Sequence, residues 1–184
     1  MSYFSHMLTV RSGFPGNIFL FSCLVLLLSC QPKEQDIKSV LYAPMPNVIM
    51  DVDEVNETNR PVADAFKAYE KGNYSLAEER FTALPEDLKT PDVRFYLGMA
   101  KYAQGKYNEA KASINFGGKY GSRFGDAARY YGIIVDYERG SKASAFEQLK
   151  NLLYNKQLGA FTEKGQQLLE YLAVDPDIPE NRDR

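Results

Sequence analysis

Few side chains of this 184-residue chain are of the types that perform chemistry at neutral pH. His6 is the only histidine, and Cys23 and Cys30 are the only cysteines. After Cys30 the sequence therefore contains no residues for a Ser–His or Cys–His relay or for a histidine-based metal site. Two carboxylates suffice for glycoside hydrolysis, but the acidic residues lie on predicted solvated faces and helix starts. We expect a protein that is not an enzyme and that uses no cofactor, metal or small-molecule substrate.

Two further short motifs also lack the spacing of a ligand site. Asp51, Asp53 and Glu54 are acidic, but they lack the regular ligand positions and the glycine turn of a calcium loop, so we expect a solvated linker. Gly117-Gly118-Lys119 follows a predicted helix, which is typical of a helix C-cap and not of a phosphate-binding loop. The net charge of −2 gives no electrostatic reason to expect a nucleic-acid partner.

The second cysteine follows an apolar segment. Arg11 supplies a positive charge, and residues 18–28 form an apolar run of eleven residues. This run is shorter than the about 20 residues that span a bilayer, and it suits a signal peptide. Its end, Leu27-Leu28-Ser29-Cys30, resembles the lipobox of bacterial lipoproteins, in which the cysteine is lipidated. Leu20-Phe21-Ser22-Cys23 fits less well, because cleavage there would leave apolar residues on the mature protein.

We therefore predict a lipoprotein signal peptide at residues 1–29, starting at Met1 or Met7, and a membrane anchor at Cys30. An ordinary cleaved signal and a short membrane anchor are the alternatives. The resemblance implies an outer-membrane location, with the rest of the chain facing the periplasm or the cell surface. Lys33-Glu34 also resembles the charged tags of some surface lipoproteins of Bacteroidetes.

Residues 30–57 are predicted to form an extended tether. Pro32, Pro44 and Pro46 interrupt any helix there. Two apolar clusters, Val40-Leu41-Tyr42 and Val48-Ile49-Met50, interrupt the tether. We interpret them as packing on the first helix pair; the alternative is a short strand that binds a partner.

The chain from Ala65 to Tyr120 repeats itself. Residues Tyr69, Gly72, Tyr74, Ala77 and Phe81 recur as Tyr102, Gly105, Tyr107, Ala110 and Ile114, each 33 positions later. A looser third copy aligns Tyr131-Gly132 with Leu97-Gly98, and Gly140, Ala145 and Leu149 with Gly105, Ala110 and Ile114. A fixed period of this size indicates a stacked array of helix pairs.

Caps and helix breakers predict the helix boundaries. The first pair is expected at residues 61–71 and 75–84, with Ser75 as an N-cap. The second pair is expected to start at Pro91, with Thr90 as its N-cap, to break at Gly105 and to resume near Asn108. Thr162 is predicted to cap a last helix, residues 163–173, whose apolar stripe covers the end of the array.

Leu97-Gly98 in a first helix and Ala77-Glu78-Glu79-Arg80-Phe81 in a second helix resemble the tetratricopeptide repeat (TPR) family. The resemblance extends over about residues 60–154. It implies an all-α fold: a right-handed superhelical array of about three TPR-like helix pairs plus a C-terminal capping helix, at residues 58–174. Residues 175–184 are then a polar C-terminal tail. Family membership also implies an inner surface, lined by the first helix of each pair, that binds peptides or protein partners.

Seven residues have the helical position expected of that inner surface, and we interpret them as a candidate partner groove. They are Phe66, Tyr69, Phe95, Met99, Tyr102, Arg129 and Ile133. Alternatively, the last helix or the tether covers this surface. The function expected is a lipid-anchored, non-enzymatic protein–protein interaction module of the bacterial envelope. The alternatives are a structural subunit of an outer-membrane assembly and a binder of cell-wall glycan.

Overall fold

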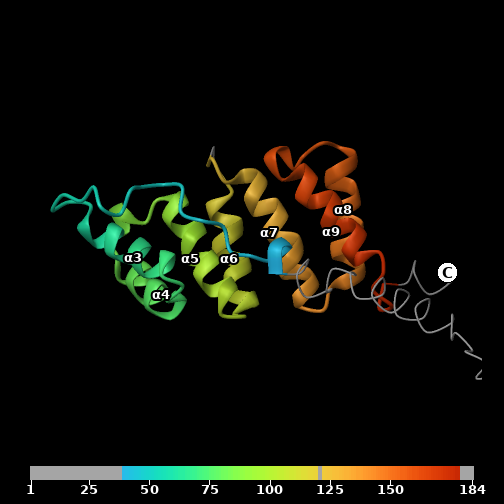
Figure 1. Ribbon diagram of the computed structural model, residues 1–184, viewed down its shortest axis with the longest axis horizontal. Coiled ribbons are helices and arrows are strands. Elements are labelled where there is room, and N and C mark those ends of the chain that lie inside the picture. Colours follow the sequence, from blue (N-terminus) through green and yellow to red (C-terminus); the bar gives the residue numbers. More distant parts are fainter. Residues whose placement is uncertain (1–38, 120–121, 179–184) are drawn as a thin grey trace, which may run out of the picture. The chain divides into compact units, whose positions relative to one another are not determined.

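The computed structural model describes residues 39–119 and 122–178. The predicted signal peptide, Cys30, Lys33-Glu34 and residues 179–184 of the tail lie outside the described residues. Every regular element in the described part is helical, so the predicted all-α class is confirmed (Figure 1). The α-helices are α3 (Arg60–Glu70), α4 (Tyr74–Ala83), α5 (Pro91–Ala103), α6 (Tyr107–Gly117), α7 (Gly125–Glu138), α8 (Lys142–Tyr154) and α9 (Thr162–Leu172). None of these described helices is long and apolar enough to cross a membrane.

The helices pack in pairs that follow one another in chain order (Figure 1). The pairs are α3 with α4, α5 with α6, and α7 with α8. Each pair turns at a glycine with a left-handed backbone: Gly72, Gly105 and Gly140 have φ of 72°, 73° and 89°. At each turn the next residue donates its N–H to the carbonyl five positions back, as Asn73 does to Ala68 at 3.0 Å. The repeated glycines therefore mark turns at which a side chain would strain the backbone.

The N-caps were predicted correctly at one of three helices. Thr90 Oγ1 accepts a hydrogen bond from the N–H of Val93 at 3.3 Å, which confirms the cap of α5. The prediction for Ser75 was wrong, because α4 begins one residue earlier and Asn73 Oδ1 accepts from the N–H of Leu76 at 3.2 Å. The prediction for Thr162 was also wrong, since Thr162 is itself the first residue of α9 and its hydroxyl donates to the Gly159 carbonyl at 2.8 Å.

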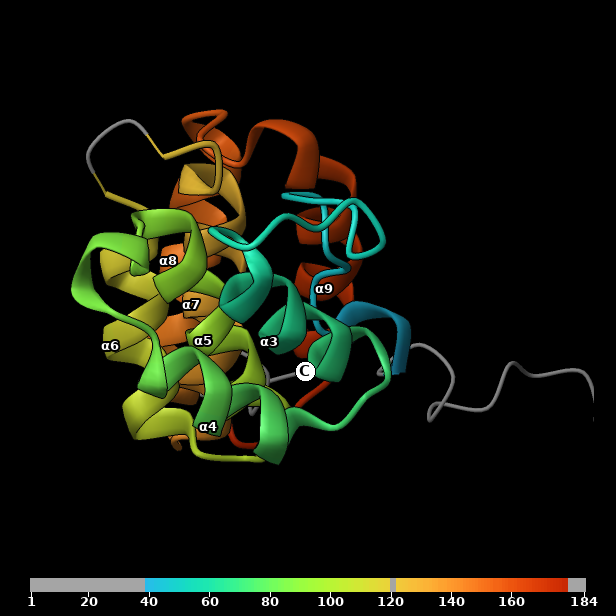
Figure 2. The same ribbon diagram turned by 90° about the vertical axis from the view of Figure 1, so that its left-hand side faces the viewer.

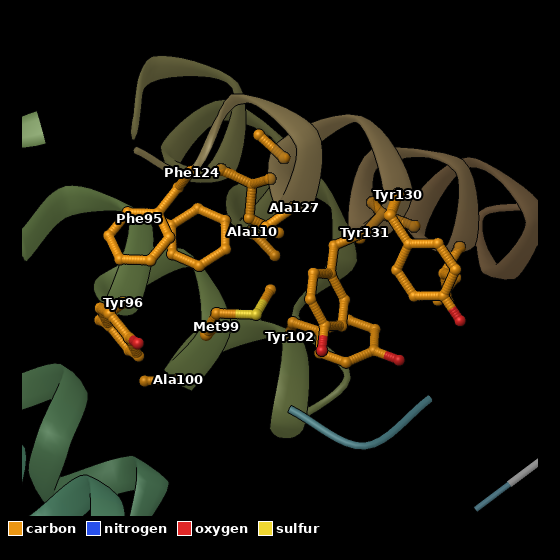
Figure 3. Close-up of a cluster of buried hydrophobic side chains, with 14 of the residues drawn as sticks. Phe95, Tyr96, Met99, Ala100, Tyr102, Ala110, Phe124, Ala127, Tyr130 and Tyr131 are labelled. Atoms are coloured by element: carbon orange, nitrogen blue, oxygen red, sulfur yellow. The ribbon is translucent and has the colours of Figure 1, made fainter. Parts of the chain in front are cut away.

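Aromatic side chains fill the space between the first helices of the pairs (Figure 3). Phe95 of α5 and Phe124, which precedes α7, stack with ring centroids 4.7 Å apart. Phe66, Phe81 and Tyr96 are fully buried beside them. At the other end of the chain, Leu168 and Leu172 of α9 are fully buried as well. The core is therefore continuous from α3 to α9.

The second and third pairs differ in how closely their two helices approach. A Cβ atom added at Gly98 of α5 would lie 2.7 Å from Ile114 Cγ1 and 2.8 Å from the Ile114 main-chain nitrogen of α6. A Cβ atom added at Gly132, the matching residue of α7, would meet only Asn115 Oδ1, at 3.9 Å. A cavity of about 510 Å³ lies there, lined by residues of α6, α7 and α8. The third pair is therefore open where the second is closed.

Candidate functional site

Residues 41–50, here called the strap, lie against the first helices of the pairs (Figures 1 and 2). The strap passes from α7 over α5 to α3, opposite to the chain order of the helices. Leu41 is part of the buried core, and Met45 and Ile49 are half-buried against it. The prediction that both apolar clusters pack on the first pair was wrong for the first cluster, because Leu41 lies at α7. The second cluster does not pack on the first pair alone, because the N–H of Val48 donates to Tyr96 of α5.

Five tyrosines of the first helices bind the strap through its main chain. Their hydroxyls donate to carbonyls in the following order: Tyr130 to Leu41 at 2.9 Å, Tyr102 to Tyr42 at 2.8 Å, Tyr131 to Ala43 at 2.8 Å, Tyr69 to Met45 at 2.7 Å and Tyr96 to Pro46 at 2.6 Å. The Tyr96 oxygen also accepts from the N–H of Val48 at 3.1 Å. We call these five residues the groove tyrosines. Figure 3 shows the hydroxyls of Tyr102 and Tyr131 pointing toward the strap, drawn in blue.

The rings of the groove tyrosines hold one another in place. Tyr69 and Tyr96 meet edge to face with centroids 5.3 Å apart, and Tyr130 and Tyr131 do the same at 5.3 Å. Tyr102 meets Tyr131 at 5.8 Å. No groove tyrosine is more than 6% exposed. Because the rings are packed on several sides, their packing fixes the direction in which each hydroxyl points.

Burial also sets the protonation state of the groove tyrosines. Loss of solvation raises the pKa of Tyr96 to about 12. Burial raises the pKa of Tyr69, Tyr102, Tyr130 and Tyr131 above its usual value as well. The phenol therefore keeps its proton well above neutral pH, and each hydroxyl can donate to a carbonyl.

The seven residues predicted for the groove do not share one surface. Phe66, Phe95 and Met99 are fully buried in the core, at 0% exposure. Tyr69 and Tyr102 contribute hydroxyls to the strap, so for these two the tether covers the surface.

The last two of the seven, Arg129 and Ile133, line the cavity beside α8. Arg129 Nη1 donates to Asp126 Oδ1 at 2.7 Å and to the Gln157 carbonyl at 3.2 Å.

Sequence reasoning missed three groove tyrosines, Tyr96, Tyr130 and Tyr131. Their partners on the strap lie 50, 89 and 88 positions away in the chain, so no local pattern links them. The adjacent pair Tyr130-Tyr131 was the available signal. Neighbouring helix positions lie about 100° apart around the axis, so two adjacent large aromatic residues cannot both point along the same direction into the core. Both hydroxyls nevertheless reach the strap.

The cavity between α6, α7 and α8 is polar at its rim. Lys111 of α6 forms an ion pair with Asp136 of α7, which is 8% exposed. Asn115 and Asn151 add side-chain amides. Within residues 39–119 and 122–178 no group of three or more His, Cys, Asp and Glu residues is placed to hold a metal ion.

Comparisons with models of protein families, with curated proteins and with solved structures find no match to this chain.

Proposed function

We propose that this chain is a lipid-anchored, non-enzymatic protein–protein interaction module of the bacterial envelope. In this proposal the helix pairs form a right-handed superhelical array of the TPR type. Cys30 carries the lipid that holds the protein at the outer membrane, facing the periplasm or the cell surface. The groove tyrosines bind an extended segment of a partner protein in place of the strap.

One observation supports this proposal above the others: the hydrogen bonds of the groove tyrosines all go to main-chain groups of a single segment. After Leu41, which ends a helical turn, this segment has no regular secondary structure. Contacts to the main chain do not depend on the identity of the side chains, so a segment of another protein can make them too. Peptides that lie extended in a groove are commonly held in this way. The strap therefore occupies the site in the way that we propose for the partner segment.

A partner must compete with the strap. A segment joined to its site by a short linker has an effective concentration of roughly millimolar. The partner segment therefore has to bind in more favourable geometry, or to make further contacts outside the groove. Binding in the cell is then selective, because weak extended peptides do not displace the strap.

The second candidate function is a structural subunit of an outer-membrane assembly, and the filled groove favours it. If the strap stays bound, the partner contacts the outer helices α4, α6 and α8. In that case the groove tyrosines only brace the array.

Affinity capture from solubilised envelopes separates the two functions. The bait is the full chain, compared with a variant in which residues 41–50 are replaced by a Gly/Ser linker of equal length. A matched control replaces the exposed residues Asp53 and Glu54 by Gly and Ser. The interaction proposal predicts that one partner is captured in a larger amount by the strap variant only. A synthetic peptide of residues 40–50, when added, should remove this excess.

An identical set of partners on all three baits would reject the groove and favour the structural subunit. Circular dichroism of each bait verifies that it is folded.

A further inference from the structure

The groove tyrosines present hydrogen-bond donors, and the strap provides the acceptors. Of the strap main-chain groups that they bind, five are carbonyls and one is the N–H of Val48. The edge of a β-sheet, by contrast, offers donors and acceptors in alternation. Between Leu41 and Pro46 this groove therefore suits a peptide with accessible carbonyls and does not require N–H groups.

Proline is the residue that meets this demand at least cost. Pro44 and Pro46 have no N–H to leave without a partner. Each proline also restricts the residue before it, Ala43 or Met45, to an extended backbone. In a polyproline II segment the carbonyls make no internal hydrogen bonds and remain available. The carbonyls of Ala43, Met45 and Pro46 are three of the five acceptors, so the contacts continue through the segment that holds the two prolines.

The exposure of the strap side chains shows which positions carry specificity. Leu41 is 1% exposed and belongs to the core. Ala43 and Pro46 are exposed, so their side chains are hardly contacted. Tyr42, Pro44 and Met45 are half-buried. The position three residues before the first proline is therefore the one whose side chain is fully enclosed, and a ligand needs an apolar side chain there.

We infer that the groove is a recognition site for peptides of the form Leu-x-x-Pro-x-Pro, in which the leucine ends a helical turn and the prolines lie in the non-helical segment that follows. The strap, from Leu41 to Pro46, is its built-in occupant. The inference rests on the proposed function, because it identifies the partner segment that takes the place of the strap. Grooves lined with aromatic side chains are a general means of binding proline-rich peptides. In this chain the aromatic rings come from three helices, α3, α5 and α7, which are far apart in the sequence.

The test uses a nicked protein, so that the strap can exchange while every described residue is present. A protease site is inserted between the exposed residues Asp53 and Glu54, which lie between the strap and α3, in the chain from residue 31 onward. After cleavage the strap fragment remains as a non-covalent peptide. Fluorescence anisotropy then follows a labelled peptide of residues 37–50 as it replaces this fragment. Circular dichroism before and after cleavage shows that the helices persist.

Three unlabelled competitors give the outcome. The first is Leu-Ser-Ser-Pro-Ser-Pro-Ser, which retains only the inferred motif; the second has both prolines replaced by alanine, and the third has its leucine replaced by serine. We expect the first to displace the label. The proline-free peptide should compete about 4- to 30-fold more weakly, because two prolines reduce the entropy lost on binding. The leucine-free peptide should also compete more weakly, because it lacks the side chain that is buried at Leu41. Equal competition by the proline-free peptide would overturn the inference while leaving the groove function intact. A strap fragment that never exchanges would reject both.

A variant pair shows that displacement occurs in the groove. In Tyr131→Phe the Ala43 carbonyl loses its donor, and we expect labelled peptide to bind about 2- to 12-fold more weakly. The matched control is Tyr154→Phe, which changes a side chain that is 87% exposed, and affinity there should not change. Equal affinity of both variants would place the peptide elsewhere and overturn the inference.

Discussion

The glycines Gly98 and Gly132 occupy matching positions in α5 and α7, yet alanine should affect the two helices in opposite directions. In a helix interior, alanine is more favourable than glycine by about 1 kcal/mol. At Gly132 the added methyl group meets no atom closer than 3.9 Å, so the variant should gain about 0.5–1 kcal/mol in free energy of unfolding. The helix propensity alone decides the result there.

At Gly98 the methyl group would collide with α6. It would lie 2.7 Å from Ile114 Cγ1, which can rotate, and 2.8 Å from the Ile114 main-chain nitrogen, which cannot. The helix α6 must therefore move as a whole, and overpacking of this kind costs about 1–3 kcal/mol. After the gain in helix propensity, Gly98→Ala should lose about 0–2 kcal/mol, which makes it about 1–3 kcal/mol less stable than Gly132→Ala.

Urea denaturation of residues 31–184, followed by far-ultraviolet circular dichroism, measures both variants against the unsubstituted protein. The comparison is internal, because both substitutions have the same effect on the unfolded chain. Equal shifts of the two midpoints in the same direction would refute the difference between a closed second pair and an open third pair.

Three other predictions concern the strap and its anchor. Tyr96→Phe should lower the free energy of unfolding by about 1–2 kcal/mol in urea denaturation, because the Pro46 carbonyl loses its donor and the Val48 N–H its acceptor, whereas Tyr154→Phe should change it by less than about 0.5 kcal/mol. The pKa of Tyr96 is raised in the folded state, so its stabilising effect is present below the unfolded pKa of about 10 and is lost as the pH rises toward about 12. Thermal unfolding midpoints should therefore fall above pH 10, and less steeply in Tyr96→Phe; a midpoint that is flat up to pH 12 would contradict the burial of these phenols. In cells that make the full chain, Cys30→Ser should abolish labelling by a fatty acid, and persistent labelling would disprove lipidation at this residue.

The helices were predictable from sequence because their ends depend on local chemistry. The boundaries expected for the first pair, residues 61–71 and 75–84, differ by one residue from α3 and α4. Gly72 fixes the turn because its backbone adopts a positive φ. Pro91 starts α5 because the fixed φ of proline suits the first position of a helix. The capping side chain of α4 was mistaken because Asn73 and Ser75 are both good caps, and only the observed start of the helix selects one.

The groove was predictable only in part, because its composition depends on contacts between distant segments. Helical periodicity placed Phe66, Phe95 and Met99 on an inner surface, but neighbouring first helices bury that face against each other. The strap then contacts the side chains that extend past this layer, and their hydroxyls mark the groove. No periodicity in the helices reveals where residues 41–50 will lie, since their partners are up to 89 positions away.

The direction in which the strap lies has a mechanical consequence. For a chain held at Cys30, as proposed, only eleven residue steps separate the lipid from Leu41, a reach of at most about 40 Å. A pull on the domain would load the bond between Tyr130 and Leu41 first, then those to Tyr42, Ala43, Met45 and Pro46 in turn. Bonds that are loaded one at a time yield at a lower force than bonds that share the load. If the strap detached, thirty residue steps would separate the lipid from Arg60, the first residue of α3. The maximum distance between them would rise to about 100 Å, and the groove would be exposed in the same movement.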